Sequence, residues 1–283
     1  MAKVYEALRK AEEERKRRSG DVSSSVQPLD VPPEPAAPKA GSATKGKVSL
    51  ADRLRFRGSS ADTADEVNKR RISVLQPDSY VAEQFRALRG RIDALASQRP
   101  IRSLCVSSPL AGEGKTTAAI NLATVTAMSV GRRVLLIDCD MRRPKVHQAL
   151  GLRPEAGLAE VLNQEIGLDQ AVLKVEGMNL EVLSVRGKPA NPSELLGSPA
   201  MRDLVEEVTS RYDRVIFDTP AALGVPDTKA VAELCDGIVV VVRADYTSQQ
   251  DLEAALDILD RRRLLGLVLN GAAVDRGRYG YSG

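Results

Sequence analysis

The sequence predicts an α/β fold in which a mostly parallel β-sheet carries helices on both faces, preceded by a disordered N-terminal linker. The first observation is that apolar runs alternate with helical stretches from Pro100 onward, as in chains that build a parallel sheet. The second is that several of these runs are almost continuously aliphatic, as strands covered on both faces must be. The expected strands are SLCVSS, RVLLID, LEVLSV, RVIFDT, GIVVVV and LGLVLN, and the clearest helices span 80–97, 116–130, 199–211, 226–234 and 248–263.

Composition along the chain divides it into four segments. The Pro-, Ser- and Ala-rich stretch before the folded part cannot bury enough apolar surface to offset its chain entropy, which predicts disorder. The first segment contains no Gly or Pro and repeats apolar residues at helical spacing, so it is either a solvated terminal helix or a docking element. The segments are an amphipathic helix at 1–18, a disordered linker at 19–71, a folded domain at 72–271 and a flexible tail at 272–283.

The overall composition excludes several classes of protein. Hydrophobic residues make up 43% of the 283 residues, which is enough for a core, and the net charge of +3 is too small to indicate nucleic-acid binding. Cys105, Cys139 and Cys235 lack metal-ligand spacing, which predicts reduced and buried thiols. There is no signal-peptide pattern and no apolar run of about 18 residues, so we expect a cytoplasmic protein.

The segment SSPLAGEGKTT, residues 107–117, has the context of a phosphate-binding loop because it follows an expected strand and opens an expected helix. Small residues let the backbone wrap an anion, and the amides of the first helical turn point at it. Lys115 would hold the outer phosphates and the Thr116 hydroxyl would bind Mg²⁺, although Pro109 stands where this loop usually begins with Gly. The fold is therefore expected to be P-loop NTPase-like, with a nucleotide held by Ala111, Gly112, Glu113, Gly114, Lys115, Thr116 and Thr117.

Acidic residues end two of the expected strands. Asp138 and Asp140 stand two residues apart after RVLLI, so both carboxylates are expected on one side, and Asp218 closes the apolar run of RVIFDTP. Ligands of open parallel sheets bind at this edge, although an Asp pair there could simply cap the next turn. Beside a phosphate loop, the three carboxylates and Lys115 indicate a catalytic site for phosphoryl transfer from Mg-ATP, with Thr116, Asp138 and Asp218 on the metal.

These motifs together resemble those of the bacterial tyrosine kinases of capsule and exopolysaccharide biosynthesis. The likeness covers about residues 72 to 283. It rests on the modified phosphate loop, LLIDCDMRRP, VIFDTP, NPSELLGSPAMRDLV (191–205) and GLVLNG. The resemblance implies an ATP- and Mg²⁺-dependent protein-tyrosine autokinase that regulates polysaccharide synthesis or export.

The resemblance also implies roles for residues outside the phosphate loop. Glu83, Arg86 and Arg89 fit a Glu-x-x-Arg-x-x-Arg motif that makes subunit contacts in a ring, whereas an exposed charged helix with intrahelical pairs is the alternative. Tyr279 and Tyr281 stand between glycines in the tail, which in this family is the substrate of a neighbouring subunit.

By the same resemblance, Asn270 contacts the adenine and Asp138, in preference to Asp140, accepts the proton of the tyrosine hydroxyl. The residues themselves do not separate the two aspartates. The resemblance further implies a separate transmembrane adaptor, a polysaccharide co-polymerase, which would recruit the cytoplasmic kinase to the inner face of the membrane. Its other partners would be protein tyrosine substrates.

Two other functions fit part of the pattern. A positioning ATPase of the ParA/MinD type shares the sheet and the aspartates, but it carries a signature Lys five residues before the phosphate-binding Lys, where this chain has Leu110. The tail also lacks the basic amphipathic helix that would hold such a switch on a membrane. A weakly active ATP-binding scaffold of the export machinery is the second alternative, and it would not need to retain Lys115 and all three carboxylates.

Overall fold

The computed structural model describes residues 78–272 of the chain. The expected N-terminal helix, the linker and residues 273–283 of the tail, which include both Tyr279 and Tyr281, lie outside the described residues. The segment boundaries drawn from composition therefore stay predictions.

A seven-stranded sheet forms the centre of the described part, in the order β3-β4-β2-β5-β1-β6-β7. Every neighbouring pair is parallel except β3 with β4 at one edge, which confirms the prediction of a mostly parallel sheet. The predicted apolar runs coincide with the parallel strands to within two residues at either end. The strands are β1 (Ser103–Ser108), β2 (Val134–Asp138), β3 (Val172–Lys174), β4 (Leu180–Leu183), β5 (Arg214–Ala221), β6 (Gly237–Arg243) and β7 (Leu264–Asn270).

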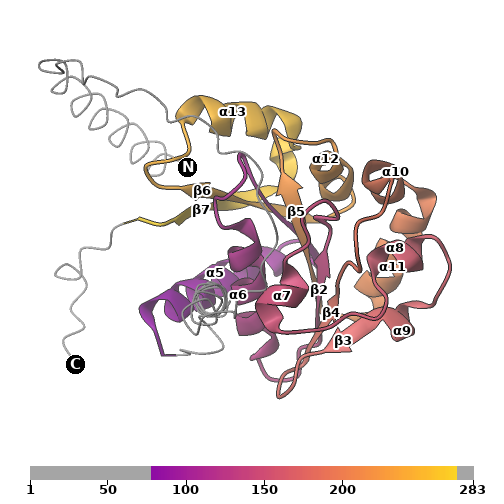
Figure 1. Cartoon of the computed structure of the whole chain (residues 1–283). Coiled ribbons are helices and arrows are strands. Elements are labelled where there is room, and N and C mark those ends of the chain that lie inside the picture. The colour runs from indigo at the N-terminus through magenta and orange to yellow at the C-terminus, as the bar shows by residue number, and fades with distance from the viewer. Residues whose placement is uncertain (1–77, 273–283) are drawn as a thin grey trace, which may run out of the picture.

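Helices cover both faces of this sheet (Figure 1). Successive side chains of a strand point to opposite faces. Along β2, Val134 and Leu136 therefore pack in the core beneath α5, α6 and α7, while Leu135 and Ile137 pack in the core beneath α8 to α13. The helices are α5 (Tyr80–Ala96), α6 (Lys115–Ala127), α7 (Val146–Leu150), α8 (Leu158–Leu162), α9 (Leu168–Ala171), α10 (Pro192–Leu196), α11 (Pro199–Arg211), α12 (Asp227–Ala232) and α13 (Gln249–Ile258), with a 3-10 turn η1 (Arg261–Arg263).

The structure corrects two details of the predicted elements. The helix expected at 248–263 ends at Ile258, because Leu259 is extended with ψ 144°. The Asp260 carboxylate then accepts the Arg262 N–H at 3.0 Å and begins η1 as a separate turn. The antiparallel strand β3 was not predicted, since an edge strand of 3 residues is too short to show a periodicity.

The parallel order gathers distant segments at the carboxyl edge of the sheet. The loop after β1 leads directly into α6, while Asp138 ends β2 and Asn270 ends β7. Asp138 and Asp218 are register partners between β2 and β5, and Arg243 and Asn270 are register partners between β6 and β7. Residues separated by more than 100 positions in the chain therefore surround one loop.

Candidate active site

The predicted phosphate loop lies between β1 and α6, as the sequence indicates. Its backbone turns through Gly112 and Gly114, whose φ angles of 84° and 97° are in the left-handed region that favours glycine. A Cβ on Gly114 would also lie 2.1 Å from the Asn270 side-chain nitrogen, so the loop has no room for a larger residue there. Thr116 is buried in the first turn of α6, and Thr117 is partly buried beside it.

Glu113 and Asn270 hold the shape of this loop from inside. The buried Glu113 carboxylate accepts the Leu110 N–H at 2.7 Å and the Thr247 hydroxyl. Burial raises the pKa of Glu113 above its ordinary value, although these hydrogen bonds oppose the shift. The Asn270 amide donates to the Glu113 carbonyl at 2.8 Å. The loop is therefore braced by groups from β6–α13 and from β7.

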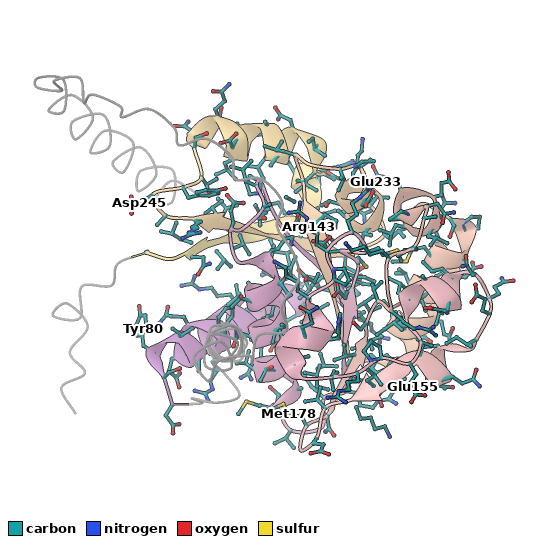
Figure 2. All side chains as sticks on the ribbon, viewed as in Figure 1. Tyr80, Arg143, Glu155, Met178, Glu233 and Asp245 are labelled. Carbon is teal, nitrogen blue, oxygen red and sulfur yellow. The ribbon has the colours of Figure 1, made fainter. Side chains whose placement is uncertain are left out.

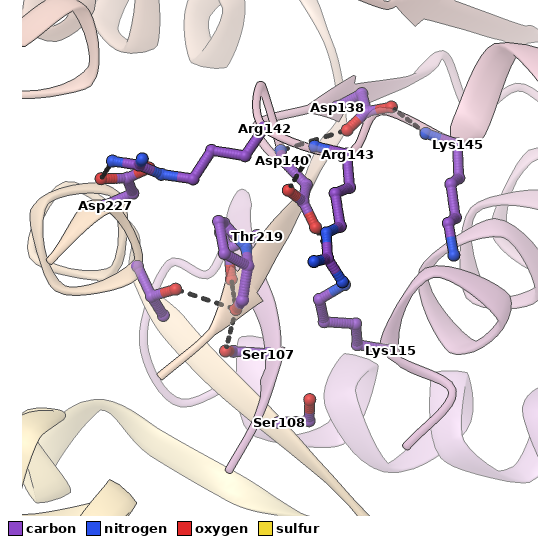
Figure 3. A network of polar contacts seen from close by, with 12 residues as sticks. Ser107, Ser108, Lys115, Asp138, Asp140, Arg142, Arg143, Lys145, Thr219 and Asp227 are labelled. Atoms are coloured by element: carbon purple, nitrogen blue, oxygen red, sulfur yellow. Dashed lines mark hydrogen bonds and ion pairs between the residues drawn. The ribbon is translucent and has the colours of Figure 1, made fainter. Parts of the chain in front are cut away.

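Lys115 lies among the three predicted carboxylates. Its ammonium forms an ion pair with Asp140 at 3.2 Å, and both side chains are largely buried. Burial lowers the pKa of Lys115, but the negative charges of Asp218 and Asp140 more than offset this effect, so the pKa is raised. The ammonium therefore stays charged beside the loop, where an anion would be held (Figure 3).

Asp138 and Asp218 are both fully buried on neighbouring strands. Burial raises the pKa of Asp138 well above its ordinary value, and the nearby Asp218 raises it further. The Asp138 carboxylate also accepts backbone N–H groups of Asp140, Lys145 and Val146, each at 3.1 Å. Asp138 therefore caps the turn into α7 and also lies in the acidic cluster. The sequence offered a turn cap and a site carboxylate as alternatives, and this residue is both.

A second polar cluster, which sequence reasoning did not assign, lies beside the first. Asp227 at the start of α12 is buried, and its carboxylate accepts Arg142 Nε at 3.0 Å and Arg142 Nη2 at 3.3 Å (Figure 3). It also accepts the Ser193 hydroxyl at 2.5 Å. Arg142 follows Asp140 in LLIDCDMRRP, and Ser193 belongs to the Asn-Pro-Ser segment. This latch of Arg142, Ser193 and Asp227 therefore ties the turn that carries Asp140 to α10 and α12.

The last residue of β6 and the turn that follows it, residues 243–247, lie against the phosphate loop, and we call this segment the clamp turn. Arg243 donates to the Gly112 carbonyl at 3.3 Å, and the Tyr246 hydroxyl lies 3.4 Å from the Ala111 carbonyl. The Arg243 guanidinium also lies 5.5 Å from the centre of the Tyr246 ring. No sequence pattern marked these residues, because only the pairing of β6 with β1 and β7 brings them to the loop.

The helix α5 places the three predicted subunit-contact residues unequally. Glu83 is exposed and forms an intrahelical ion pair with Arg86. Arg89 instead donates to the Val125 carbonyl near the end of α6 at 2.6 Å. The Glu83–Arg86 pair is therefore intrahelical, and the Glu83 carboxylate is exposed. Arg89 instead anchors α5 to α6 of the same domain.

The donor set fits a magnesium ion that a nucleotide brings with it. Carboxylate and hydroxyl oxygens are the ligands that Mg²⁺ prefers, and Thr116, Asp138 and Asp218 supply them at this edge. Within residues 78–272, no group of three or more His, Cys, Asp or Glu side chains is placed to hold a metal alone. A nucleotide-bound Mg²⁺ takes one or two carboxylates together with phosphate oxygens, and this donor set fits such an ion.

Comparison with known proteins gives the family. A family model described as an AAA domain matches residues 101–264. Tyrosine-protein kinase YwqD of Bacillus subtilis is 38% identical over 215 residues, which are 75% of this chain and 90% of that protein. Tyrosine-protein kinase ptk of Acinetobacter johnsonii is 32% identical over 74% of this chain, but the match covers 28% of that longer protein. The kinase domain of the Escherichia coli tyrosine kinase ETK superposes with a TM-score of 0.68 at 30% identity, over 72% of this chain and 81% of that domain.

The match to YwqD spans nearly the whole of that relative, and the family model covers more than half of this chain. Both agree with the nucleotide-binding fold and with the loop, Lys115 and aspartates found at the carboxyl edge of the sheet. The chain therefore belongs to the bacterial tyrosine-protein kinases that are built on a P-loop domain.

Proposed function

We propose that this tyrosine kinase transfers the γ-phosphoryl group of ATP to Tyr279 and Tyr281 in the tail of another copy, and so regulates capsule or exopolysaccharide synthesis. The observation that carries the proposal is the charged Lys115 ammonium, which pairs with Asp140 beside two further buried carboxylates at the phosphate loop. A site that only bound a phosphate would not need this acidic cluster. A kinase uses such a cluster to place a metal ion and to receive a proton.

Each residue of the site has a proposed task. Amides of the loop from Ala111 to Thr117 would cradle the phosphates, and Lys115 would neutralise the outer ones. Thr116, Asp138 and Asp218 would hold Mg²⁺, which supplies charge neutralisation of the transferring group when bound. Asn270, which already braces the loop through Glu113, would contact the adenine.

Asp138 is the proposed proton acceptor. A tyrosine hydroxyl has a pKa near 10, so its proton must leave as the new phosphate ester forms. Asp138 is fully buried, and in the metal-free site its burial and the nearby Asp218 raise its pKa. Asp140 instead forms the ion pair with Lys115. Asp140 would therefore position the ammonium while Asp138 takes the proton.

We further propose that a separate transmembrane adaptor of the polysaccharide machinery recruits this kinase to the inner face of the membrane. The matched relatives have two lengths, since the match covers 90% of YwqD but 28% of ptk. In residues 78–272, no helix is long and apolar enough to cross a membrane. Among these relatives, the matched region makes up most of YwqD but only a part of the longer ptk. A separate adaptor would supply to a short kinase what the rest of the longer protein supplies to its own kinase part.

The geometry favours a kinase over a positioning ATPase. Such ATPases place a signature Lys where this chain has Leu110, and here the Leu110 N–H is bound to Glu113 within the loop. No cation at this position is available to reach a partner's phosphate. The scaffold alternative is less favoured because Lys115 and the three carboxylates are all retained and lie together.

Mass spectrometry of the purified full chain after incubation with Mg-ATP tests the proposal. We expect phosphate on Tyr279 and Tyr281 in the wild type and none in Lys115→Met, because that variant lacks the ammonium for the outer phosphates. Lys229→Met, at an exposed lysine of α12, is the matched control and should be labelled like the wild type. Phosphate on these two tyrosines in Lys115→Met would contradict the proposal, as would an unlabelled tail in the wild type with adaptor present.

A further inference from the structure

The three tyrosines within residues 78–272 differ sharply in accessibility. Tyr212 is 5% exposed and its hydroxyl binds the Glu181 carboxylate, so it is closed to a phosphoryl donor. Tyr80 and Tyr246 are 46% and 47% exposed. Tyr80 begins α5, away from the phosphate loop (Figure 2). The Tyr246 hydroxyl, in contrast, touches the loop at the Ala111 carbonyl. Tyr246 is therefore an accessible phenol whose state can affect nucleotide binding.

The clamp turn presents Tyr246 outward while it holds the loop. Figure 2 shows the neighbouring Asp245 at the periphery of the molecule. The Tyr246 hydroxyl lies 3.4 Å from the Ala111 carbonyl, and its ring lies against Arg243, which donates to Gly112. Thr247 in the same turn binds Glu113. One side-chain hydroxyl thus belongs to a set of contacts that fixes the phosphate loop.

We propose that Tyr246 is a further phosphoacceptor, phosphorylated by another copy of the chain, and that phosphate there releases the clamp turn and weakens nucleotide binding. This inference rests on the tyrosine-kinase function proposed above. In the reaction, Tyr246 Oη bonds to the γ-phosphorus of ATP held by the other copy. The bond from that phosphorus to the β–γ bridging oxygen breaks, ADP leaves, and the phenolic proton passes to a carboxylate of that copy and then to solvent.

Phosphorylation would reverse the contacts that Tyr246 now makes. The ester oxygen has no hydrogen to donate to Ala111, and the new group adds a charge of about −1.5 to −2 beside that carbonyl. Arg243 would turn toward the phosphate and away from Gly112, since guanidinium–phosphate pairs are strong. The added charge would also repel a nucleotide triphosphate in the same loop. Repulsion between like charges near a protein surface weakens affinity about tenfold or more.

The test uses the full chain with Tyr279→Phe and Tyr281→Phe, so that the tail accepts no phosphate. The wild type, this tail variant, the same variant with Tyr246→Phe, and the same variant with Tyr80→Phe are each incubated with Mg-ATP and desalted. Phosphopeptides are then mapped, and the affinity for ADP is measured by calorimetry before and after incubation. Tyr80→Phe is the matched control, because it removes an equally exposed hydroxyl that lies away from the loop.

We expect phosphate on Tyr246 in the tail variant, together with about tenfold weaker ADP binding after incubation. Tyr246→Phe should keep its starting affinity after incubation, and Tyr80→Phe should lose affinity as the tail variant does. A wild-type chain labelled on its tail but never on Tyr246 overturns this inference and leaves the proposed function intact. Phosphate on Tyr246 with unchanged ADP affinity also overturns it. A wild-type chain labelled on no tyrosine overturns the proposed function itself.

Discussion

The surroundings of individual residues in the phosphate loop shift their pKa values. Glu113 shows this most clearly, since its carboxylate is buried inside the loop and accepts the Leu110 N–H and the Thr247 hydroxyl. Burial disfavours its charged form more strongly than these donors favour it, so its pKa is raised. A carboxyl group in this state makes the stability of the loop depend on pH.

We predict that the free energy of unfolding falls as pH rises from about 4.5, the ordinary pKa of Glu, through the raised pKa of Glu113. In this window the folded state binds more protons than the unfolded state, so stability is present below it and lost as pH rises. Glu113→Gln keeps one acceptor oxygen, for either the Leu110 N–H or the Thr247 hydroxyl, but it does not titrate, so its profile should be flatter. Urea denaturation across this range measures both proteins, and parallel profiles would show that Glu113 does not titrate there.

At the scale of elements, the latch of Arg142, Ser193 and Asp227 joins three segments that the sequence separates widely. Asp227 is buried, whereas Arg142 is partly exposed and can regain water if the pair is broken. The cost of breaking the latch therefore comes from the lost hydrogen bonds of Asp227 and from the cavity that it leaves. The same change would free the turn that carries Asp140.

We predict that Asp227→Ala lowers the free energy of unfolding by about 2 kcal/mol. Phosphoryl transfer should fall as well, because Asp140 would no longer be held against Lys115. Glu233→Ala, at the C-cap of the same helix, is the matched control, since the side chain of Glu233 forms an exposed pair with Lys229 and its loss should change stability by less than about 0.5 kcal/mol. Chemical denaturation and ATP labelling measure the two effects. Equal stability of the two variants would mean that the latch does not hold α12.

The helix α5 separates a folding role from a proposed assembly role. Arg89 is bound to the Val125 carbonyl of its own domain, whereas Glu83 is exposed on the outer side. We propose that Glu83 and Arg86 provide the outward contacts of the ring, with Arg89 holding the helix in place.

We predict opposite results for two substitutions in α5. Arg89→Ala should lower the free energy of unfolding by about 1 kcal/mol, because it leaves a backbone carbonyl of α6 without its donor. Glu83→Ala should leave stability within about 0.5 kcal/mol but lower the mass of the particle in solution. Light scattering of the full chain measures the mass. An undisturbed oligomer in Glu83→Ala would remove this residue from the proposed subunit contact.

Over the whole molecule, the sequence predicts those elements whose signal lies in residues that are adjacent along the chain. Apolar runs such as GIVVVV revealed the parallel strands, and the order of small residues before Lys115 revealed the phosphate loop. Asp227, Arg243 and Tyr246 were not predicted to be near that loop, because their contacts come from strand pairing and no local pattern marks them. The strand β3 and the end of α13 were missed for a related reason, since a short antiparallel edge strand and one extended residue leave no periodic signal.

Phosphorylation of the tail in trans requires that one copy of the molecule supplies the active site and another supplies the acceptor tyrosine. A mixing experiment measures this requirement most directly. The Lys115→Met chain has an intact tail but lacks the phosphate-binding ammonium, and the Tyr279→Phe, Tyr281→Phe chain has an intact site but no tail acceptor. The two are combined with Mg-ATP, with adaptor present, and the tail peptides are analysed by mass spectrometry. We expect phosphate on Tyr279 and Tyr281 of the Lys115→Met chain only when both chains are present. Tail peptides that stay unmodified in the mixture, while the wild type phosphorylates its own tail, would contradict phosphorylation in trans.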